Sequence, residues 1–179
     1  SIKGNGEGPT SPYALQKMTA EIETRLYSEL YDLDTVSLRY FNVYSEDLPA
    51  NGPYATAICN WMQYIRDKKD PFITGDGNQR RDMLHVDDAV SANIFAMNSD
   101  KDFNGKNYDV GTGDNVSLNE IKEVIELLHP DINFEFRENR PNEVASTKAD
   151  IYPLKKLGWQ TEISIKKGIF RCFKQLQKA

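Results

Sequence analysis

The sequence predicts an α/β protein, because segments with strand character alternate with amphipathic helical segments along the chain. A long helical pattern covers about residues 12–31 and is followed by a β-branched and aromatic run over 35–44. Further strand-like runs at 72–74, 106–110 and 132–136 are separated from one another by helical patterns. At 179 residues the chain is long enough for one domain or slightly more, with a substantial core.

The first helix has the clearest local signals. Pro12 suits the first helical turn, where its missing N–H costs nothing, and Thr10 or Ser11 can cap that turn. Tyr13 and Lys17 lie four residues apart on one face. They stand roughly opposite a stripe of aliphatic side chains, which is made of Leu15, Met18, Ile22, Leu26, Leu30 and Leu33.

The middle of the chain continues the alternation. Residues 45–53 are predicted to form a loop, residues 54–69 a helix, residues 75–78 a tight turn and residues 79–86 an extended segment. Asp87 is expected to cap the next helix, which runs to about Ser99.

The last third has one strong cap and two further helices. Ser117 and Glu120 have the spacing of a capping box before a helix over 118–128. Polar, irregular sequence follows the strand-like run at 132–136 and extends over 137–148. The final helices are predicted at about 150–158 and 163–177.

Composition excludes several functions. The net charge is −5 and the sequence pI about 5.1, so no basic field exists to attract nucleic acid or anionic lipid. Cys59 and Cys172 do not have metal-site spacing with His85 and His129, and two isolated cysteines suit a reducing compartment. No apolar run approaches a membrane span and the start lacks a signal-peptide pattern, so a cytoplasmic location is expected.

Two features carry candidate chemistry. A tyrosine one turn from an ammonium group can exchange a proton near neutral pH, because the cation favours the phenolate. Tyr13 and Lys17 fit that description, although a half-buried tyrosine beside a solvated lysine is the simpler alternative. Arg81 follows a glycine turn and Arg140 precedes a proline, and guanidinium groups in such settings suit phosphate. Asp82 beside Arg81 favours the alternative of a surface ion pair.

Taken together and in order, these segments resemble the extended short-chain dehydrogenase/reductase family, in particular its nucleotide-sugar 4-epimerases. Ser11-Pro12-Tyr13-x-x-x-Lys17 resembles the catalytic pair, and Arg39 to Tyr44 resembles the strand that follows it. The segments Gly75-x-Gly77-x-Gln79-x-Arg81-Asp82 and Arg140-Pro141-Asn142-Glu143 are similar to those that supply phosphate arginines and a ribose-binding acid. The resemblance covers nearly the whole chain, as the C-terminal half of such an enzyme.

The resemblance implies an NAD-dependent enzyme that inverts C4 of a UDP-hexose through a 4-keto intermediate. By it, Tyr13 and Lys17 are catalytic and, with Phe41, contact NAD. Five residues contact the UDP-sugar substrate: Asn42, Phe72, Arg81, Arg140 and Glu143. Packing in the core is an equal alternative for Phe72, and His85 is expected to be structural.

The resemblance also implies the organisation of the chain. Residues 1–53 would belong to a Rossmann-type domain, and residues 54–179 mainly to a small α/β substrate-binding lobe, with possible segments that return to the Rossmann sheet. The 33–44 strand is expected to lie apart from that lobe. A homodimer is expected because the first helix has an apolar face with nothing to cover it.

The sequence departs from the family pattern at several positions. Gln16, Ser45 and Asn142-Glu143 replace the family's usual residues, and Pro9 rules out a G-x-G-x-x-G motif in the opening glycine-rich segment. Because that cofactor motif is missing, the isolated chain is expected to be inactive. The alternatives are a nucleotide-sugar 4,6-dehydratase or decarboxylase, and a truncated homologue without catalysis.

Overall fold

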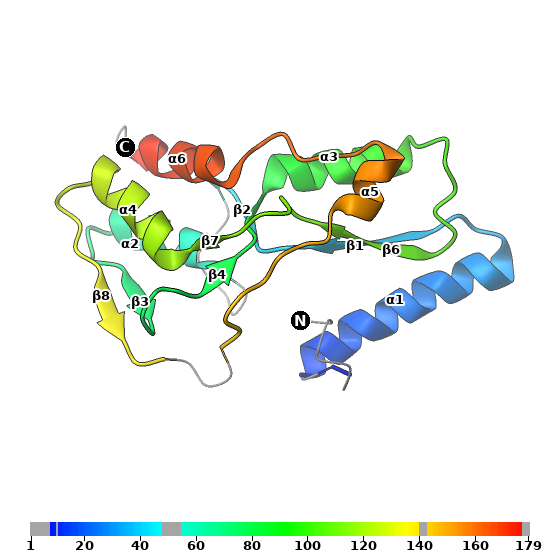
Figure 1. Cartoon of the computed structure of the whole chain (residues 1–179), viewed down its shortest axis with the longest axis horizontal. Helices are drawn as coiled ribbons and strands as arrows, with labels where there is room; N and C mark the ends of the chain where they lie inside the picture. The colour runs from blue at the N-terminus through cyan, green and yellow to red at the C-terminus, as the bar shows by residue number, and fades with distance from the viewer. Residues whose placement is uncertain (1–7, 10, 48–54, 140–142, 177–179) are drawn as a thin grey trace.

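The fold is α/β, as the sequence predicts. The computed structural model describes residues 8–9, 11–47, 55–139 and 143–176. Figure 1 shows a long helix at one side of a thin sheet, two helices on the other side of that sheet, and a second group of short strands and helices farther from the first helix. Within the described residues, no helix is both long and apolar enough to cross a membrane.

The first layer is built on a parallel strand pair. β1 (Val36–Tyr40) pairs with β6 (Lys106–Val110), with Val36 opposite Lys106 and Tyr40 opposite Val110. α1 (Pro12–Tyr31) packs on one side of this pair, and α3 (Val86–Met97) and α5 (Tyr152–Leu157) pack on the other (Figure 1). The expectation that the 33–44 strand lies apart from residues 54–179 is therefore wrong.

The pairing of β1 with β6 has a simple physical reason. Parallel strands need a long crossover connection. The chain between β1 and β6 supplies it, because it passes through part of the second group of strands and helices and then through α3. The assignment of residues 1–53 and 54–179 to separate units remains a prediction, and β6 is one segment of the latter range that lies in the sheet of the former.

α1 begins and ends as local chemistry predicts. The Ser11 side chain accepts a hydrogen bond from the Ala14 N–H at 3.1 Å, and Asp32 closes the helix in the left-handed region at φ 54°. After Asp32 the chain turns back, and β1 runs antiparallel to α1. Thr35 Oγ1 donates to the Thr24 carbonyl at 2.8 Å. Farther along, the Arg39 guanidinium pairs with the Glu21 carboxylate.

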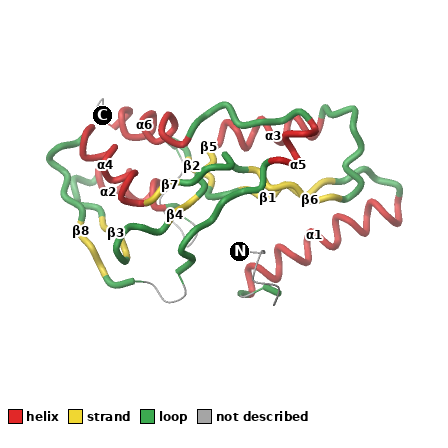
Figure 2. The backbone as a smooth tube through the Cα atoms, viewed as in Figure 1, coloured by secondary structure: helices red, strands yellow, loops and turns green. Residues whose placement is uncertain are grey.

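The second group of elements lies farther from α1 and, in the described part of the chain, consists of short strands and three helices (Figure 2). β2 (Val43–Tyr44) pairs in parallel with β5 (Leu84–His85), and β3 (Phe72–Thr74) pairs in parallel with β8 (Glu135–Arg137). β4 (Arg80–Arg81) pairs antiparallel with β7 (Val116–Ser117). The helices here are α2 (Ala57–Arg66), α4 (Leu118–Leu128) and α6 (Ile165–Gln175).

Each group has its own apolar core. One buried cluster lies among α2, α4 and α6, and its fully buried members include Ile58, Met62, Ile121, Ile125 and Phe173. The other lies between α3, α5 and the β1–β6 pair, and it includes Ala92, Tyr108, Val110, Leu154 and Trp159. Burial of such side chains stabilises the fold by about 25 cal/mol per Å² of apolar surface.

Most helix boundaries agree with the sequence pattern, and the clearest agreement is the capping box of Ser117 and Glu120. The start of α3 differs, because His85 and not Asp87 is its N-cap. His85 Nδ1 accepts from the Asp87 N–H at 3.2 Å, and His85 Nε2 lies 3.1 Å from Glu46 Oε2. The ring is buried, and its contacts here are structural ones.

The other boundaries shift by a few residues. The predicted 54–69 helix is the shorter α2, the predicted 132–136 strand is β8 at 135–137, and part of the irregular 137–148 segment forms a bridge from Ser146 to Arg80. α5 begins at Tyr152, two residues after the predicted start at 150, with Ile151 as N-cap and no side-chain cap hydrogen bond.

Candidate active site

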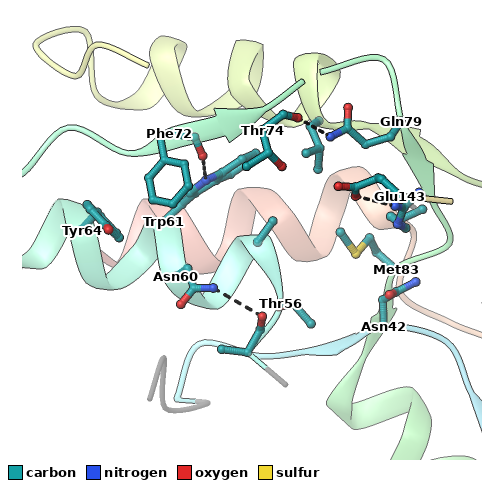
Figure 3. A pocket seen from close by; sticks show the side chains of 14 residues that line it. Asn42, Thr56, Asn60, Trp61, Tyr64, Phe72, Thr74, Gln79, Met83 and Glu143 are labelled. Carbon is teal, nitrogen blue, oxygen red and sulfur yellow. Dashed lines mark hydrogen bonds and ion pairs between the residues drawn. The ribbon is translucent and has the colours of Figure 1, made fainter. Parts of the chain in front are cut away.

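A pocket of about 290 Å³ opens between α2, β3 and the β4 segment. In Figure 3 the aromatic side chains of Tyr64, Phe72 and Trp61 gather at one end, and Gln79, Glu143 and Asn42 lie at the other. Asn42, Phe72, Arg81 and Glu143 all line it. Four of the residues that the sequence singled out for substrate, from four separate parts of the chain, are therefore brought together.

The aromatic end is formed by β3 and α2. Phe72 lies on β3, and Tyr64 meets its ring edge-on with centroids 5.8 Å apart. Trp61 Nε1 donates to the Phe72 carbonyl at 2.9 Å, which ties the helix to the strand. On Phe72 the Arg137 guanidinium lies 3.8 Å from the ring centroid. This rigid aromatic wall suits a planar ring, because flat groups bind aromatic faces by stacking.

A helix cap, a strand pairing and a glycine turn hold α2 and β3 in place. Thr56 is the N-cap of α2, and its side chain accepts from the Cys59 N–H at 3.4 Å. β3 gains order from its parallel pairing with β8, in which Thr74 lies opposite Arg137. Gly75 then turns the chain at φ 76°, a conformation that glycine adopts without strain.

The polar end contains two charged groups. Arg81 Nη2 lies 2.8 Å from Glu143 Oε1, and both side chains are largely buried, with 16% and 19% of their surface exposed. The other carboxylate oxygen, Glu143 Oε2, is buried and has no hydrogen-bond partner among the residues the structure describes. An acceptor in this position suits a ligand that brings a hydroxyl group.

Asn42 lies between β1 and β2 and lines the pocket. The expected continuous strand over 35–44 is broken here, since Asn42 has φ 35° and separates β1 from β2. Asparagine tolerates this conformation better than most residues do. Its side-chain Nδ2 donates to the Asp82 carbonyl at 2.7 Å, which fixes the amide at the pocket wall.

Asp82 is a residue whose part in this site the sequence analysis misread. Its carboxylate accepts hydrogen bonds from backbone N–H groups and a hydroxyl and forms no ion pair with Arg81 among the described residues. The fully buried carboxylate accepts from the Thr112 N–H at 2.9 Å, the Thr112 hydroxyl at 2.8 Å, and the Gly113 and Ala149 N–H groups at 3.1 Å. It thereby joins the loop after β6 to the segment that leads back from Glu143.

Tyr13 and Lys17 lie on α1, outside the lining of the pocket. Both side chains are exposed, and Lys17 Nζ is 5.6 Å from the Tyr13 ring centroid. Tyr13 is about 12 Å along the helix from Glu21 at ~1.5 Å per residue. Asn42 is about 10 Å beyond Arg39, the partner of Glu21, at ~3.3 Å per residue. The pair and the carboxyl end of β1 therefore lie at the same end of this layer.

Two candidate residues stand apart from this arrangement. The Phe41 side chain is half-buried and does not line the pocket, while its N–H donates to the Val110 carbonyl at 3.0 Å. Arg140 lies outside the described residues. Of the groups that the sequence analysis missed, Trp61 lies three residues before Tyr64, on the same face of the predicted helix, which is a local signal. Nothing local pointed to Gln79, whose Nε2 donates to the Thr74 carbonyl at 2.7 Å.

Buried titratable groups away from the pocket do not compete for a chemical role. Burial raises the pKa of the Cys172 thiol to about 12, so it stays protonated and unreactive. Burial also raises the pKa of the Tyr44 phenol well above its usual range. No group of three or more metal-ligating side chains occurs in the part of the chain that the structure describes.

Comparison with known proteins places this geometry in a family. Residues 3–111 match the NAD dependent epimerase/dehydratase family, so the chain belongs to that family. A putative UDP-glucose 4-epimerase of Methanocaldococcus jannaschii is 35% identical over 167 residues, which are 91% of this chain and 52% of the relative. A UDP-glucuronate 4-epimerase of Thermodesulfobacterium geofontis is 36% identical over 166 residues, which are 91% of this chain and 49% of that protein.

Solved structures agree. A UDP-N-acetylglucosamine 4-epimerase from Methanobrevibacter ruminantium, solved in complex with UDP-N-acetylmuramic acid, has a TM-score of 0.85 and 31% identity, and the match covers 98% of this chain and 57% of that one. The chain thus spans about half the length of the relatives it matches. Less similar relatives include proteins named as a decarboxylase and as a multifunctional enzyme with a 4,6-dehydratase activity.

Proposed function

We propose that this chain is the substrate-binding half of an NAD-dependent epimerase that interconverts the C4 epimers of a UDP-hexose. The observation that carries the proposal is the pocket itself, with an aromatic wall at one end and the Arg81–Glu143 pair at the other. That order of groups matches a nucleotide, whose base stacks and whose diphosphate binds guanidinium groups. The family membership supports the same assignment.

Each lining residue then has a role toward the UDP-sugar. Phe72 stacks on the base, and Arg81 binds the diphosphate together with Arg140. Glu143 accepts a hydrogen bond from a ribose hydroxyl through Oε2, the oxygen without a partner among the described residues. Asn42, at the carboxyl end of β1, contacts the sugar nucleotide where open α/β sheets bind their ligands.

The residues present fit the nicotinamide end of NAD. Tyr13 and Lys17 present a hydroxyl and an ammonium on the exposed face of α1, and these are donors that suit ribose hydroxyls. Phe41 adds an aromatic side chain at the end of β1. Bound there, NAD supplies a reversible acceptor for the hydride from the sugar C4.

The chain's own residues handle the proton. Tyr13 Oη takes the proton of the sugar C4 hydroxyl as the C4–H bond breaks and returns it after the 4-keto sugar has turned its other face. Lys17 holds the nicotinamide ribose and stabilises the phenolate by its charge. The pocket holds the nucleotide at a distance from the reacting carbon, so the sugar can rotate while the UDP stays bound.

Two alternative functions can be separated by experiment. Relatives with decarboxylase and dehydratase names favour a nucleotide-sugar dehydratase or decarboxylase as the second enzyme class. The other alternative is a homologue that binds a nucleotide sugar without turnover. Product analysis distinguishes a dehydratase or decarboxylase from the proposed epimerase, and a turnover assay distinguishes a non-catalytic homologue from it.

We also propose a homodimer in the cytoplasm. Five large apolar side chains of the α1 segment are at least 40% exposed: Leu15, Ile22, Leu26, Leu30 and Leu33. An exposed apolar stripe of this length favours association. The free thiols of Cys59 and Cys172 suit a reducing compartment.

The experiment compares the chain alone with a fusion to the N-terminal half of a homologous epimerase. The chain alone should bind UDP-glucose by calorimetry and release it unchanged. The fusion should convert it to UDP-galactose, and Tyr13→Phe should lower that rate about 10³-fold, within the range for loss of a general acid–base group. Tyr27→Phe, the same change on the same helix, is the control and should leave the rate unaltered.

Three results would contradict the proposal. A 4-keto-6-deoxy product would assign the dehydratase class, and full activity of the Tyr13→Phe fusion would remove the proton-transfer role. Failure of the chain to bind any uridine nucleotide would remove the pocket's assignment.

A further inference from the structure

The Arg81–Glu143 pair places a negative charge where a diphosphate has to bind. Arg81 Nη2 and Glu143 Oε1 are 2.8 Å apart, and both residues line the pocket. They are the only charged residues among its described lining residues. A phosphate that binds Arg81 therefore shares the guanidinium with the Glu143 carboxylate or displaces it.

The carboxylate is only half compensated. One oxygen faces Arg81, and the other is buried with no hydrogen-bond partner in the described ranges. Arg81 also donates through Nη1 to the Arg80 carbonyl at 2.9 Å, so its guanidinium is fixed from a second side. With Arg81 fixed and partly buried, the remaining charge of Glu143 is screened less than a surface charge.

The effect of that charge depends on the ligand. The diphosphate of a nucleotide sugar is substituted at both ends and carries two negative charges. A free nucleoside diphosphate ends in a phosphate monoester, which loses a second proton near pH 6 and so carries a third charge at pH 8. The repulsion from Glu143 is therefore larger for the free nucleotide than for the nucleotide sugar.

We propose that Glu143 is a selectivity residue that favours the doubly charged nucleotide sugar over the free nucleoside diphosphate at Arg81. The inference rests on the proposed function of the pocket. It assigns a consequence to the pairing itself, because a carboxylate that contacted only the ribose would act on both ligands equally. The ribose and base are common to UDP-glucose and UDP, so their contacts cancel in the ratio of the two dissociation constants.

The test measures the Kd of UDP and of UDP-glucose by calorimetry for the 179-residue chain and for Glu143→Gln at pH 8. The variant keeps the side-chain length and removes the charge. It should lower the ratio of the UDP Kd to the UDP-glucose Kd about tenfold, as expected for one unit charge at about 6 Å in a partly screened site. At pH 5.5, where UDP loses most of its third charge, the two proteins should differ much less.

Glu120→Gln is the matched control. Glu120 Oε2 lies 2.7 Å from Arg80 Nη1, next to Arg81 in sequence, but Glu120 does not line the pocket. Glutamine at this position preserves the capping box, so the helix start is retained. The ratio should be unchanged in this variant.

The outcomes separate the inference from the proposed function. If the wild-type chain binds neither ligand, both fail. If it binds them and the Glu143→Gln ratio equals the wild-type ratio, or Glu120→Gln shifts the ratio as much, only the selectivity role is overturned. The selectivity role is supported if, at pH 8, the ratio of the UDP Kd to the UDP-glucose Kd falls in Glu143→Gln but not in Glu120→Gln, and if the difference between Glu143→Gln and the wild type shrinks at pH 5.5.

Discussion

The pocket and helix α1 are built in different ways. The pocket is enclosed by short elements whose side chains are held by specific bonds, such as Trp61 Nε1 to the Phe72 carbonyl and Asn42 Nδ2 to the Asp82 carbonyl. α1 buries Ala14 alone among its described side chains, and it is fixed to the sheet by a few polar contacts. The proposed binding site is therefore organised within this chain, whereas the proposed catalytic pair, Tyr13 and Lys17, is presented on a surface.

This difference bears on which functions the chain performs by itself. A pocket whose walls are fixed by hydrogen bonds within the chain is preorganised for a ligand. Under the proposed mechanism, Tyr13 and Lys17 need a nicotinamide and a sugar placed against them, because the proton leaves the C4 hydroxyl oxygen while the hydride leaves C4 itself. The comparison predicts that binding and turnover are separable in this protein.

The largest effect should come from Asp82, on which the pocket rests. Asp82→Ala leaves the N–H groups of Thr112, Gly113 and Ala149 without their acceptor, and it should lower the free energy of unfolding by about 3 kcal/mol or more. Urea denaturation measures this change. The exposed Asp131→Ala is the control, with a change within about 0.5 kcal/mol. A loss for Asp82→Ala no larger than the control's would show that the carboxylate does not hold the pocket together.

A smaller effect, confined to binding, should follow at Arg81. Arg81→Ala should weaken UDP-glucose binding by about 1.5–3 kcal/mol, since it removes a charged hydrogen bond to phosphate. Arg140→Ala should have a similar effect if both arginines bind one diphosphate. Calorimetry measures both. Arg25→Ala removes an exposed arginine on α1, outside the pocket lining, and it should leave the UDP-glucose affinity unchanged.

The caps and the pocket residues show which features can be predicted from the sequence and which cannot. Ser11, Ser117 and Glu120 were predicted as caps because capping depends on residues three or four positions apart. The gathering of Phe72, Arg81 and Glu143 in one pocket followed from a resemblance, and local pattern alone would not have supplied it. The pairing of Arg81 with Glu143 joins residues 62 positions apart, and no periodicity encodes that contact.

Other structural features could not be predicted for the same reason, because they depend on contacts between residues far apart in the sequence. The β1–β6 pairing depends on a crossover through the second lobe, so the strand expected to lie apart is central to its layer. Asp87 is a reasonable cap by residue type, but α3 begins earlier, at Val86, and the buried ring of His85 accepts a hydrogen bond from the Asp87 N–H. The role of Asp82 required three distant backbone donors to converge on one carboxylate.

The smallest effect concerns α1 and the proposed homodimer. Leu30 is 68% exposed on α1, in the apolar stripe that also contains Leu26 and Leu33. If two chains associate through this stripe, Leu30→Ser should weaken the dimer by about 1 kcal/mol or more, because a leucine in an interface buries apolar surface that serine lacks. Light scattering over a dilution series at micromolar concentration measures the dissociation constant.

Leu127→Ser is the matched control for this prediction. Leu127 is 84% exposed on α4, away from the stripe, so the same substitution there should leave the dimer unchanged while testing for general effects of added polarity. A monomer at every concentration would contradict the proposed dimer, and equal effects of the two substitutions would place the interface elsewhere. Because the pocket does not include α1, neither substitution should alter the affinity for UDP-glucose. Weaker dimerisation with unchanged nucleotide affinity would show that the helix surface and the pocket act independently.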